Sequence, residues 1–257
     1  MKLENKVAIV TGAGTGIGKS IALLFAEEGA KVVLANRTES TGEGTKALIE
    51  GEGGEAIFVR TDVSQSKQVK ALIENTVEHF GGLDILVTNA GIWDPKNLVD
   101  LDEESWDRTI DINLKGTYLC AHHAAPHLIA RGAGVILTVS SPLGFAALVN
   151  ESSYCASKAG ILLLTKVWAL ELVKHNIRVN CLVPGAIDTP MLWQGLTPEE
   201  KDKLQKEIEE ETPMGRVGYP DEMAKAALFL VSEDCSYATG TSFVADGGDL
   251  AKLAAAI

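Results

Sequence analysis

The sequence predicts a single α/β domain with a parallel sheet of about seven strands and helices on both faces of that sheet. Short apolar runs alternate with amphipathic helical patterns, and no composition break or linker divides the chain of 257 residues. Right-handed crossovers return the chain to the same direction, so strands joined by helices become parallel neighbours. We therefore expect residues 1–257 to form one doubly wound domain.

Seven apolar runs rich in β-branched residues predict buried strands. In chain order they are Val7–Val10, Lys31–Ala35, Ala56–Val59, Ile85–Thr88, Val135–Val139, Arg178–Leu182 and Ser242–Ala245. Helical patterns, with apolar residues three and four positions apart, fall between them. They include Ile17–Glu28, Lys67–Phe80, Trp106–Ala130, Ala156–Lys174 and Glu222–Val231.

Composition and charge exclude several classes of function. Hydrophobic residues make up 46% of the chain and charged residues 23%, as in ordinary globular proteins. The formal charge of -12 disfavours nucleic acid and anionic membrane surfaces as partners. No membrane-spanning or secretory segment is apparent, so we expect a cytoplasmic protein. The four cysteines show no C-x-x-C spacing and are expected to be reduced and mostly buried.

A glycine-rich turn joins the first strand to an amphipathic helix, with the sequence Thr11-Gly12-Ala13-Gly14-Thr15-Gly16-Ile17-Gly18. Glycines let the backbone approach a pyrophosphate, whose charge is favoured by the helix N-terminus. The spacing fits G-x-x-x-G-x-G and not G-x-G-x-x-G. We expect a dinucleotide to contact Gly12, Thr15, Gly16, Ile17 and Gly18.

Together with later segments, this turn resembles the short-chain dehydrogenase/reductase family, whose members are NAD(P)(H)-dependent oxidoreductases with a Rossmann-type fold. Asp62-Val63 follows the third strand, Thr88-Asn89-Ala90-Gly91 follows the fourth, and Asp246-Gly247-Gly248 comes late in the chain. The resemblance implies that Asp62 and Val63 hold the adenine and that Asn89, Ala90 and Gly91 lie along the cofactor. We expect Thr88, which replaces the family's first asparagine, to keep a local side-chain hydrogen bond.

Four residues match the family's catalytic tetrad. Tyr154 and Lys158 have the Y-x-x-x-K spacing, which puts both on one helix face. Ser141 is the second of two serines after a strand, and Asn113 lies in the preceding helix. The resemblance implies that Tyr154 is the general acid/base, Ser141 orients the reacting oxygen, Lys158 tunes Tyr154 and holds the nicotinamide ribose, and Asn113 supports a proton-relay water. Taken alone, Ser141 could be a turn hydroxyl and Asn113 a backbone-bonding amide.

The end of the second strand bears on the choice of cofactor. Asn36 is neutral where an acid would bind the ribose hydroxyls, and Arg37 can pair with a 2′-phosphate, so NADP(H) is favoured and NAD(H) stays possible. A solvated loop arginine is the alternative. By resemblance, the segment Val183-Pro184-Gly185-Ala186-Ile187-Asp188-Thr189-Pro190 holds the nicotinamide carboxamide, so we assign Pro184, Gly185, Ile187 and Thr189 to the cofactor site.

Residues 188–218 stand apart because apolar side chains flank the charged stretch Pro198–Glu211. They predict either a substrate lid or a solvated surface helix. Trp93, Phe145, Leu148 and Trp193 follow strand ends, where open α/β sheets bind ligands, so we expect them with Ser141 to line the substrate pocket; core packing is the alternative.

Three histidines, His122, His123 and His127, share one helix, but no carboxylate or cysteine stands nearby at ligand spacing, so we assign no metal site. An interface or surface role fits them better, and the resemblance implies a homotetramer.

The expected reaction interconverts a secondary alcohol and a ketone, or an aldehyde and an alcohol, on a small-molecule substrate. A 3-oxoacyl-carrier-protein reductase is one alternative, although its acidic partner argues for a basic docking patch that a charge of -12 disfavours. A non-catalytic NAD(P)-sensing protein is another, but it would be expected to lose members of the tetrad.

Overall fold

The computed structural model describes residues 1–252 and confirms the predicted fold class. Seven strands form one sheet in the order β3-β2-β1-β4-β5-β6-β7, and every neighbouring pair is parallel. The strands are β1 (Val7–Thr11), β2 (Lys31–Asn36), β3 (Glu55–Arg60), β4 (Ile85–Thr88), β5 (Gly134–Val139), β6 (Ile177–Pro184) and β7 (Ser242–Ala245). All seven runs predicted from the sequence lie in these strands.

The central strands are apolar because both faces of the sheet are covered. Every residue of β1 is buried, and its Val10 pairs with Leu34 of β2 on one side and Val87 of β4 on the other. Burial on both faces removes the apolar/polar alternation of a half-exposed strand. The continuous runs in the sequence therefore reflect helices packed on each face.

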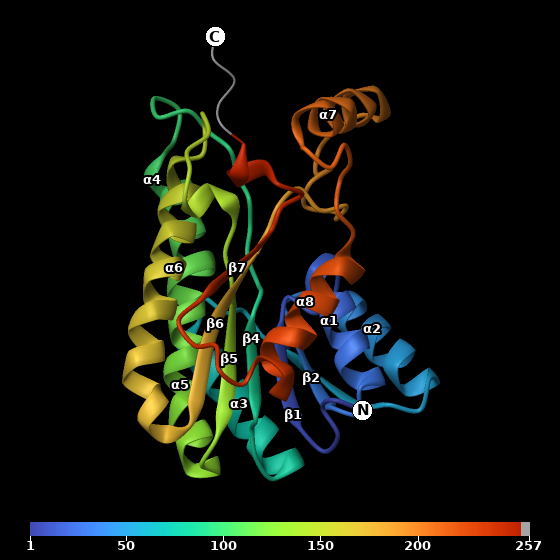
Figure 1. The fold of residues 1–257 in the computed structure, drawn as a ribbon, viewed down its shortest axis with the longest axis vertical. Helices are drawn as coiled ribbons and strands as arrows, with labels where there is room; N and C mark the ends of the chain where they lie inside the picture. Colours follow the sequence, from blue (N-terminus) through green and yellow to red (C-terminus); the bar gives the residue numbers. More distant parts are fainter. Residues whose placement is uncertain (253–257) are drawn as a thin grey trace.

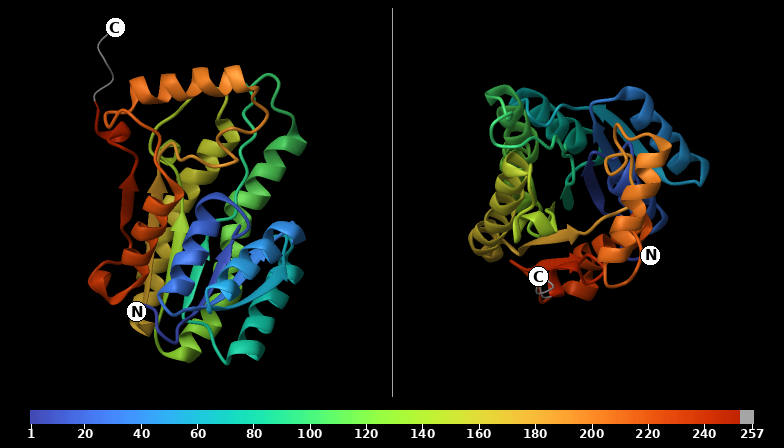
Figure 2. Two further views of the ribbon diagram at one scale, coloured as in Figure 1. Left: turned by 90° about the vertical axis from the view of Figure 1, so that its right-hand side faces the viewer. Right: turned by 90° about the horizontal axis from the view of Figure 1, so that it is seen from above.

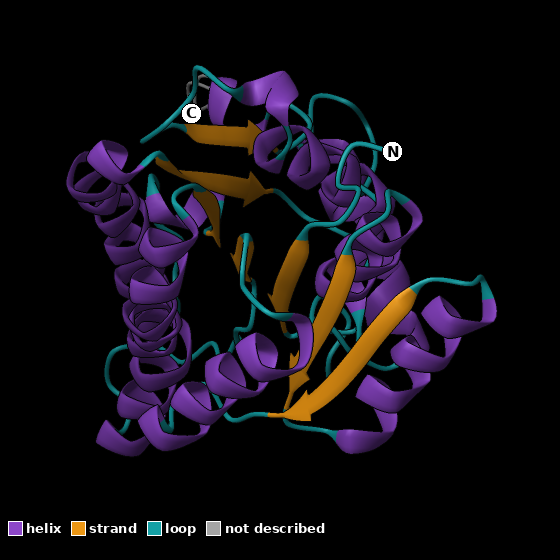
Figure 3. Cartoon of the chain, turned by 90° about the horizontal axis from the view of Figure 1, so that it is seen from below, coloured by secondary structure: helices purple, strands orange, loops and turns teal. Residues whose placement is uncertain are grey.

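Helices cover the two faces of the sheet (Figures 1 and 3). On one face lie α1 (Gly16–Glu27), α2 (Glu39–Gly51) and α8 (Pro220–Val231); on the other lie α3 (Ser66–Phe80), α4 (Glu103–Thr109), α5 (Gly116–Arg131) and α6 (Ser152–Leu172). Each face has its own core, with Phe25 of α1 packed in the first and Leu128 of α5 in the second. Within residues 1–252, no helix has the length and apolar character needed to cross a membrane.

The structure changes one of the predicted helices. The pattern Trp106–Ala130 is not continuous, because α4 ends at Thr109, a π-helical stretch follows over Ile110–Lys115, and α5 then begins at Gly116. Single π-helical turns are frequent at functional sites. Asn113 lies within this stretch, so the break sets the position of a proposed site residue.

The strand order reverses between β1 and β4, and this reversal positions the site. The connection after β1 leads to α1 on one face, whereas the connection after β4 leads toward α4 and α5 on the other. A crevice therefore opens between the carboxyl ends of these two strands, which is where open α/β sheets bind ligands. The glycine turn follows β1, and Asn89 directly follows β4.

Helix α7 (Pro198–Glu211) lies apart from both helical layers, beyond the carboxyl ends of the strands (Figures 1 and 2). None of its residues is buried. Thr197 begins it with a capping box, in which its side chain accepts from the backbone N–H of Glu200 while the Glu200 carboxylate accepts from the N–H of Thr197. The charged stretch is thus a well-capped surface helix above the strand ends. This arrangement is compatible with both a substrate lid and a solvated surface helix.

Candidate active site

The glycine turn after β1 has backbone conformations that favour glycine. Gly12 and Gly16 have φ angles of 67° and 53°, in the left-handed region. A Cβ added to Gly18 would lie 2.3 Å from the carbonyl oxygen of Gly12, so any side chain there would disrupt the turn. Thr15 makes no capping hydrogen bond and the first turn of α1 carries no acid, which leaves the helix N-terminus suited to a phosphate group.

Hydrogen bonds join the turns after β1 and β4. The hydroxyl oxygen of Thr11 accepts from the backbone N–H groups of Asn89 and Ala90, at 3.0 Å each. The Asn89 amide donates to the carbonyl oxygen of Thr11 at 2.9 Å. The sequence analysis gave Thr11 no role, yet its hydroxyl fixes the position of Asn89.

The expectation for Thr88 was wrong. Its Oγ1 is buried and has no hydrogen-bond partner among the described residues. Thr11 and Asn89 make the hydrogen bonds between the two strand ends, and the Thr88 hydroxyl is left without a partner there.

At the end of β2, the side-chain amide of Asn36 makes its hydrogen bonds within the loop that follows the strand. Its Nδ2 donates to the hydroxyl of Thr41 at 3.1 Å and to the carbonyl of Thr38, while its Oδ1 is buried without a partner in the described residues. Arg37 is exposed and makes no ion pair within residues 1–252. The guanidinium is therefore free to meet a phosphate, and no acid occupies this strand end to oppose one.

Asp62 and Val63 lie beside the same crevice, after β3. The Asp62 carboxylate accepts from the backbone N–H and the hydroxyl of Ser64, at 3.0 and 2.7 Å, which orients the turn. Val63 is buried against Gly116, where an added Cβ would lie 2.8 Å from Val63 Cγ2. These contacts fix the backbone of the turn after β3.

The residues after β6 face the glycine turn across the crevice. A Cβ on Gly16 would lie 3.0 Å from Cγ2 of Thr189. Gly185 donates to the carbonyl of Ala245 at 3.0 Å and leaves no room for a side chain beside Asp246, which ties the segment after Pro184 to the end of β7. Close-packed glycines, an uncapped helix start and a free arginine all fit a phosphate-bearing dinucleotide.

The two serines after β5 have different partners. Ser140 Oγ donates to the carbonyl of Lys158 at 2.8 Å, so its proton is used within the fold. Ser141 Oγ accepts from the N–H of Leu143 at 3.2 Å, and its own O–H interacts with Tyr154. Gly144 lies against α6, where an added Cβ would be 2.9 Å from the carbonyl oxygen of Lys158. The turn therefore brings Ser141 close to the start of α6.

Tyr154 and Lys158 lie one turn apart on α6, with the Lys158 Nζ 5.4 Å from the centroid of the Tyr154 ring. Burial raises the pKa of Tyr154 to about 12, and a hydrogen bond with Ser141 partly opposes this increase. Burial lowers the pKa of Lys158 to about 8, and its Nζ donates to the carbonyl of Val139 at 3.1 Å. The lysine is therefore anchored to β5 while its charge stays close to the phenol.

Asn113 connects the π-helical stretch to the loop after β4. Its Oδ1 accepts from the N–H of Ile92 at 2.8 Å, and its Nδ2 donates to the Ile92 carbonyl at 3.0 Å and to Ser157 Oγ at 3.2 Å. Ser157 in turn donates to the carbonyl of Tyr154 at 2.7 Å. The structure thus brings Asn113 and the Tyr154–Lys158 pair into one region, and Asn113 has the backbone-bonding geometry that the residue alone suggested.

Two tryptophans stand near the strand ends, each with its indole N–H bound to a carboxylate. Trp93 Nε1 donates to Glu151 Oε1 at 2.8 Å, and Trp193 Nε1 donates to Asp188 Oδ1 at 2.6 Å. The Nζ of Lys201, on α7, lies 4.8 Å from the Trp193 ring centroid. Both rings are half-buried and oriented, so they can form apolar walls.

Phe145 and Leu148 are 53% and 57% exposed, so neither packs in the core. Their position before α6 leaves them available to a ligand. Glu151 was missed by the sequence analysis; a lone acid between apolar loop residues and Tyr154 was the available signal.

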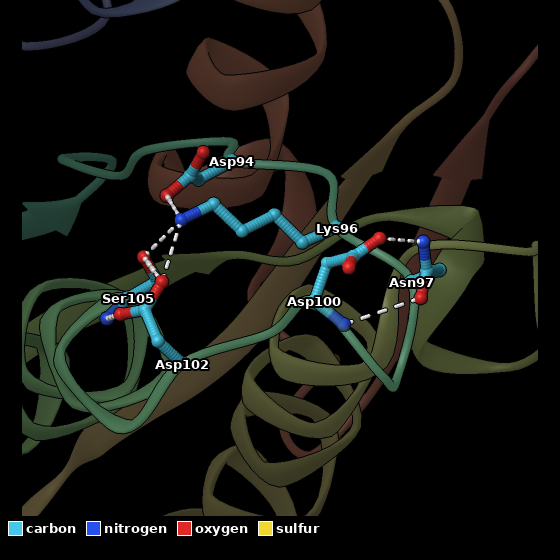
Figure 4. A network of polar contacts seen from close by, with 6 residues as sticks. All are labelled: Asp94, Lys96, Asn97, Asp100, Asp102 and Ser105. Carbon is cyan, nitrogen blue, oxygen red and sulfur yellow. Dashed lines mark hydrogen bonds and ion pairs between the residues drawn. The ribbon is translucent and has the colours of Figure 1, made fainter.

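A polar network secures the loop that carries Trp93 (Figure 4). Lys96 Nζ binds Asp102 Oδ2 at 2.9 Å and Ser105, and Asp94 lies at the edge of ion-pair distance. The backbone N–H of Lys96 donates to the carbonyl of Asn150 at 2.9 Å. The loop is therefore fastened both to α4 and to the segment before α6.

The histidine cluster lies on the outer face of α5 beside α3. His123 Nε2 hydrogen bonds with Ser66 Oγ at 3.1 Å, and His122 stacks on Tyr118. Among the described residues, no group of three or more His, Cys, Asp or Glu side chains is arranged to hold a metal ion.

Two further tryptophans lie in helices and differ in environment. Trp106 is 37% exposed, whereas Trp168 packs against the second core.

Comparison with known proteins places these features in context. A family profile described as enoyl-(acyl carrier protein) reductase matches residues 12–249. The chain is 42% identical over 244 residues to a cis-4-hydroxycyclohexanecarboxylate dehydrogenase of Sinomonas cyclohexanicum, covering 95% of this chain and 96% of the relative. It is 40% identical over 248 residues to a 3-oxoacyl-[acyl-carrier-protein] reductase of Thermotoga maritima, covering 96% and 99%. The crystal structure of a short-chain type dehydrogenase/reductase from Mycobacterium marinum superimposes with a TM-score of 0.90 at 38% identity, covering 96% of both chains.

Proposed function

Because this chain belongs to the short-chain dehydrogenase/reductase family, an NAD(P)(H)-dependent family acting on CH–OH groups, we propose that Tyr154, Ser141, Lys158 and Asn113 catalyse its interconversion of a secondary alcohol and a ketone. The observation that carries this proposal is the position of Tyr154. Its half-buried phenol interacts with Ser141, lies near Lys158 and stands at the carboxyl ends of the strands. A tyrosine placed in this way can exchange a proton with a substrate oxygen.

Tyr154 gives its proton to the substrate oxygen during reduction, and its phenolate removes a proton from the alcohol during oxidation. Ser141 donates a hydrogen bond to the same oxygen, since its Oγ already accepts from Leu143. The cofactor, when bound, supplies or accepts the hydride. Lys158 stabilises the phenolate by its charge, and Asn113 holds the loop after β4 against α6.

The preferred cofactor is NADP(H). Arg37 is exposed and unpaired in the described part of the chain, and Asn36 adds no negative charge at the ribose. A guanidinium pairs with a 2′-phosphate through charge-assisted hydrogen bonds, whereas NAD(H) offers it only hydroxyls. Gly12, Thr15, Gly16, Ile17 and Gly18 bind the pyrophosphate.

The substrate is a compact, partly apolar small molecule. Trp93, Phe145, Leu148 and Trp193 form its walls, and residues 188–218 act as a lid above them. The support for a lid is that α7 lies beyond the strand ends with no buried residue, while Thr189, in the segment before it, lies against Gly16 of the glycine turn. The cytoplasmic location expected from the sequence stays a prediction.

A 3-oxoacyl-carrier-protein reductase is the second candidate, favoured by the identity to the Thermotoga protein over nearly the whole chain. The charge of -12 argues against docking an acidic carrier protein. Activity on a free ketone with none on an acyl thioester would separate the two functions.

The chain is proposed to assemble as a homotetramer. Two faces carry exposed apolar side chains: one on α6 with Leu163, Val167 and Leu170, and one on α8 and β7 with Phe229 and Phe243. Exposed apolar patches of this kind mark association surfaces. Two separate faces can each form a two-fold contact, and two such contacts build a closed tetramer.

The proposed function is tested by the initial rate at which NADPH or NADH is consumed with a panel of ketones, aldehydes, keto-sugars, steroids and acyl thioesters. We expect turnover of a ketone class with NADPH preferred. Binding of both cofactors without turnover of any compound would instead support the sensing function.

A further inference from the structure

Glu151 is a buried carboxylate close to the reacting tyrosine, and no role assigned above uses it. Only 3% of the residue is exposed. It is the residue that directly precedes α6, three positions before Tyr154. The charge of Glu151 also raises the pKa of Tyr154, so the carboxylate is within electrostatic reach of the phenol.

The two carboxylate oxygens of Glu151 differ in their surroundings. Oε1 accepts from Trp93 Nε1 at 2.8 Å, whereas Oε2 is buried and has no hydrogen-bond partner in the described part of the chain. Burial raises the pKa of Glu151, and the bond from Trp93 opposes this. A buried carboxylate oxygen without a donor is costly, so its retention beside a reacting group calls for a donor from outside the fold.

The surroundings of Glu151 are fixed on the side away from α7. The N–H of Lys96 holds the Trp93 loop on Asn150, and the Lys96 ammonium fastens the loop to Asp102 (Figure 4). The neighbouring wall residues Phe145 and Leu148 are apolar and offer no side-chain donor. Oε2 is almost inaccessible in this structure, so a ligand group reaches it only when the side chains that cover it move aside. One unpaired acceptor uncovered in this way can select a ligand by the hydrogen bond that the ligand supplies.

Resting on the proposed function, we propose that Oε2 of Glu151 accepts a hydrogen bond from a second hydroxyl group of the substrate. The enzyme therefore prefers diols and hydroxyketones to alcohols and ketones with one oxygen. A hydroxyl suits this position because it can pair with a carboxyl group in either protonation state, whereas an ammonium group requires the carboxylate to be ionised. Glu151 thereby determines specificity, and Tyr154 remains the acid/base.

The test compares oxidation of cyclohexanol with that of cis- and trans-1,2-cyclohexanediol by the full-length protein with NADP+. For the wild type, we expect kcat/KM to be about tenfold or more higher for one diol, the effect of one hydrogen bond to a charged group. Glu151→Leu should lower this diol preference by about tenfold. Glu78→Gln removes an exposed carboxylate at the end of α3 and should keep the wild-type preference.

If Glu151→Leu fails to fold, Glu151→Gln tests whether the Glu151 carboxylate accepts a hydrogen bond from the substrate. Its amide oxygen can still accept from Trp93, so the fold should be kept, while its amide N–H groups can donate to an ether oxygen that the wild-type carboxylate cannot bind. The preference for 1,2-cyclohexanediol over 2-methoxycyclohexanol should therefore fall several-fold in Glu151→Gln. An unchanged diol-over-ether preference in Glu151→Gln would overturn the inference, and so would equal oxidation of diol and monoalcohol by the wild type.

Binding separates this inference from the proposed function. Calorimetry measures the affinity of the diol and of the monoalcohol for the protein with NADP+ already bound. Glu151-dependent binding of the diol without oxidation would keep the inference and refute the proposed function. If the wild type oxidises both compounds and Glu151→Leu lowers kcat/KM equally for the diol and the monoalcohol, the inference is refuted and the proposed function is kept.

Discussion

At the residue scale, the proposed preference for NADP(H) rests on Arg37. Its guanidinium is exposed beside Asn36, whose amide is bound to its own loop. A 2′-phosphate bound at this strand end could therefore pair with the exposed guanidinium of Arg37. This is a local property of the β2 terminus, so it can be tested without disturbing Tyr154.

Replacing Arg37 by glutamine should weaken the use of NADPH and leave that of NADH nearly unchanged. A hydrogen bond to a charged group contributes about 1.5–3 kcal/mol, so the KM for NADPH should rise about 10- to 100-fold. Steady-state kinetics with both cofactors measure this. Arg108→Gln, exposed on α4 away from the end of β2, is the matched control. An equal rise in the KM for NADPH and for NADH would show that Arg37 has no role in selecting the 2′-phosphate.

Local patterns in the sequence could predict part of the site. The Y-x-x-x-K spacing places Tyr154 and Lys158 on one face because the helical repeat alone fixes it. The environment of Glu151 could not be predicted, because its burial depends on the Trp93 loop folding over it from 58 positions away. The same limit applies to Thr88: Thr11 of β1 makes the hydrogen bonds at the end of β4, and the Thr88 hydroxyl has no partner among the described residues.

At the scale of elements, the strands were predictable and one helix boundary was not. Each strand contains a run of apolar residues, and β1 is buried over its whole length. Asn113, in the π-helical stretch, makes hydrogen bonds with Ile92, 21 positions earlier. The spacing of apolar residues in the sequence gives no sign of these contacts. Helix α2 was not singled out, because its buried residues Gly42, Thr45 and Ile49 make a weak apolar face.

The proposed lid gives a prediction at this scale. Asp188→Ala removes the acceptor that orients Trp193, so the ring should lose its fixed position over the crevice. One hydrogen bond contributes about 0.5–1.5 kcal/mol, so the substrate KM should rise about 3- to 10-fold with a smaller change in kcat.

Initial-rate kinetics on the best substrate, together with a thermal melt, would test the role of Asp188. Glu199→Ala, on the exposed first turn of α7, should leave the KM unchanged. A wild-type KM in Asp188→Ala would refute the role of Trp193 as a substrate wall.

For the whole molecule, strand and helix alternation predicts the parallel sheet, but the contacts that join distant segments come only from the structure. Arg178 of β6 is an example. Its guanidinium donates to the carbonyls of Leu230, Val231 and Ser232 at the end of α8, at 2.8, 3.2 and 3.0 Å, and to Ala238 at 3.4 Å. A cation at a helix C-terminus is also favoured by the helix dipole.

Arg178→Met should destabilise the fold without altering the chemistry of the site. The carbonyls would lose their donor, at a cost of about 2–4 kcal/mol, which lowers the melting temperature by about 5–12 °C in a domain of this size. Calorimetry measures the melting temperature. Arg108→Met, exposed on α4, should melt within about 1–2 °C of the wild type, as most surface substitutions do. An equal melting temperature for Arg178→Met and the wild type would show that these hydrogen bonds contribute little to the stability of the fold.

The central claim is that Tyr154 exchanges the proton with the substrate, and Tyr154→Phe tests it most directly. The measurement is kcat/KM for the best ketone found in the panel, together with the affinity for NADPH followed by fluorescence. We predict a loss of about 100- to 10,000-fold in kcat/KM, the usual contribution of a general acid, with NADPH affinity within about twofold of the wild type. Tyr118→Phe, on the outer face of α5, should retain full activity. Activity of Tyr154→Phe within a few-fold of the wild type would contradict the proposed mechanism.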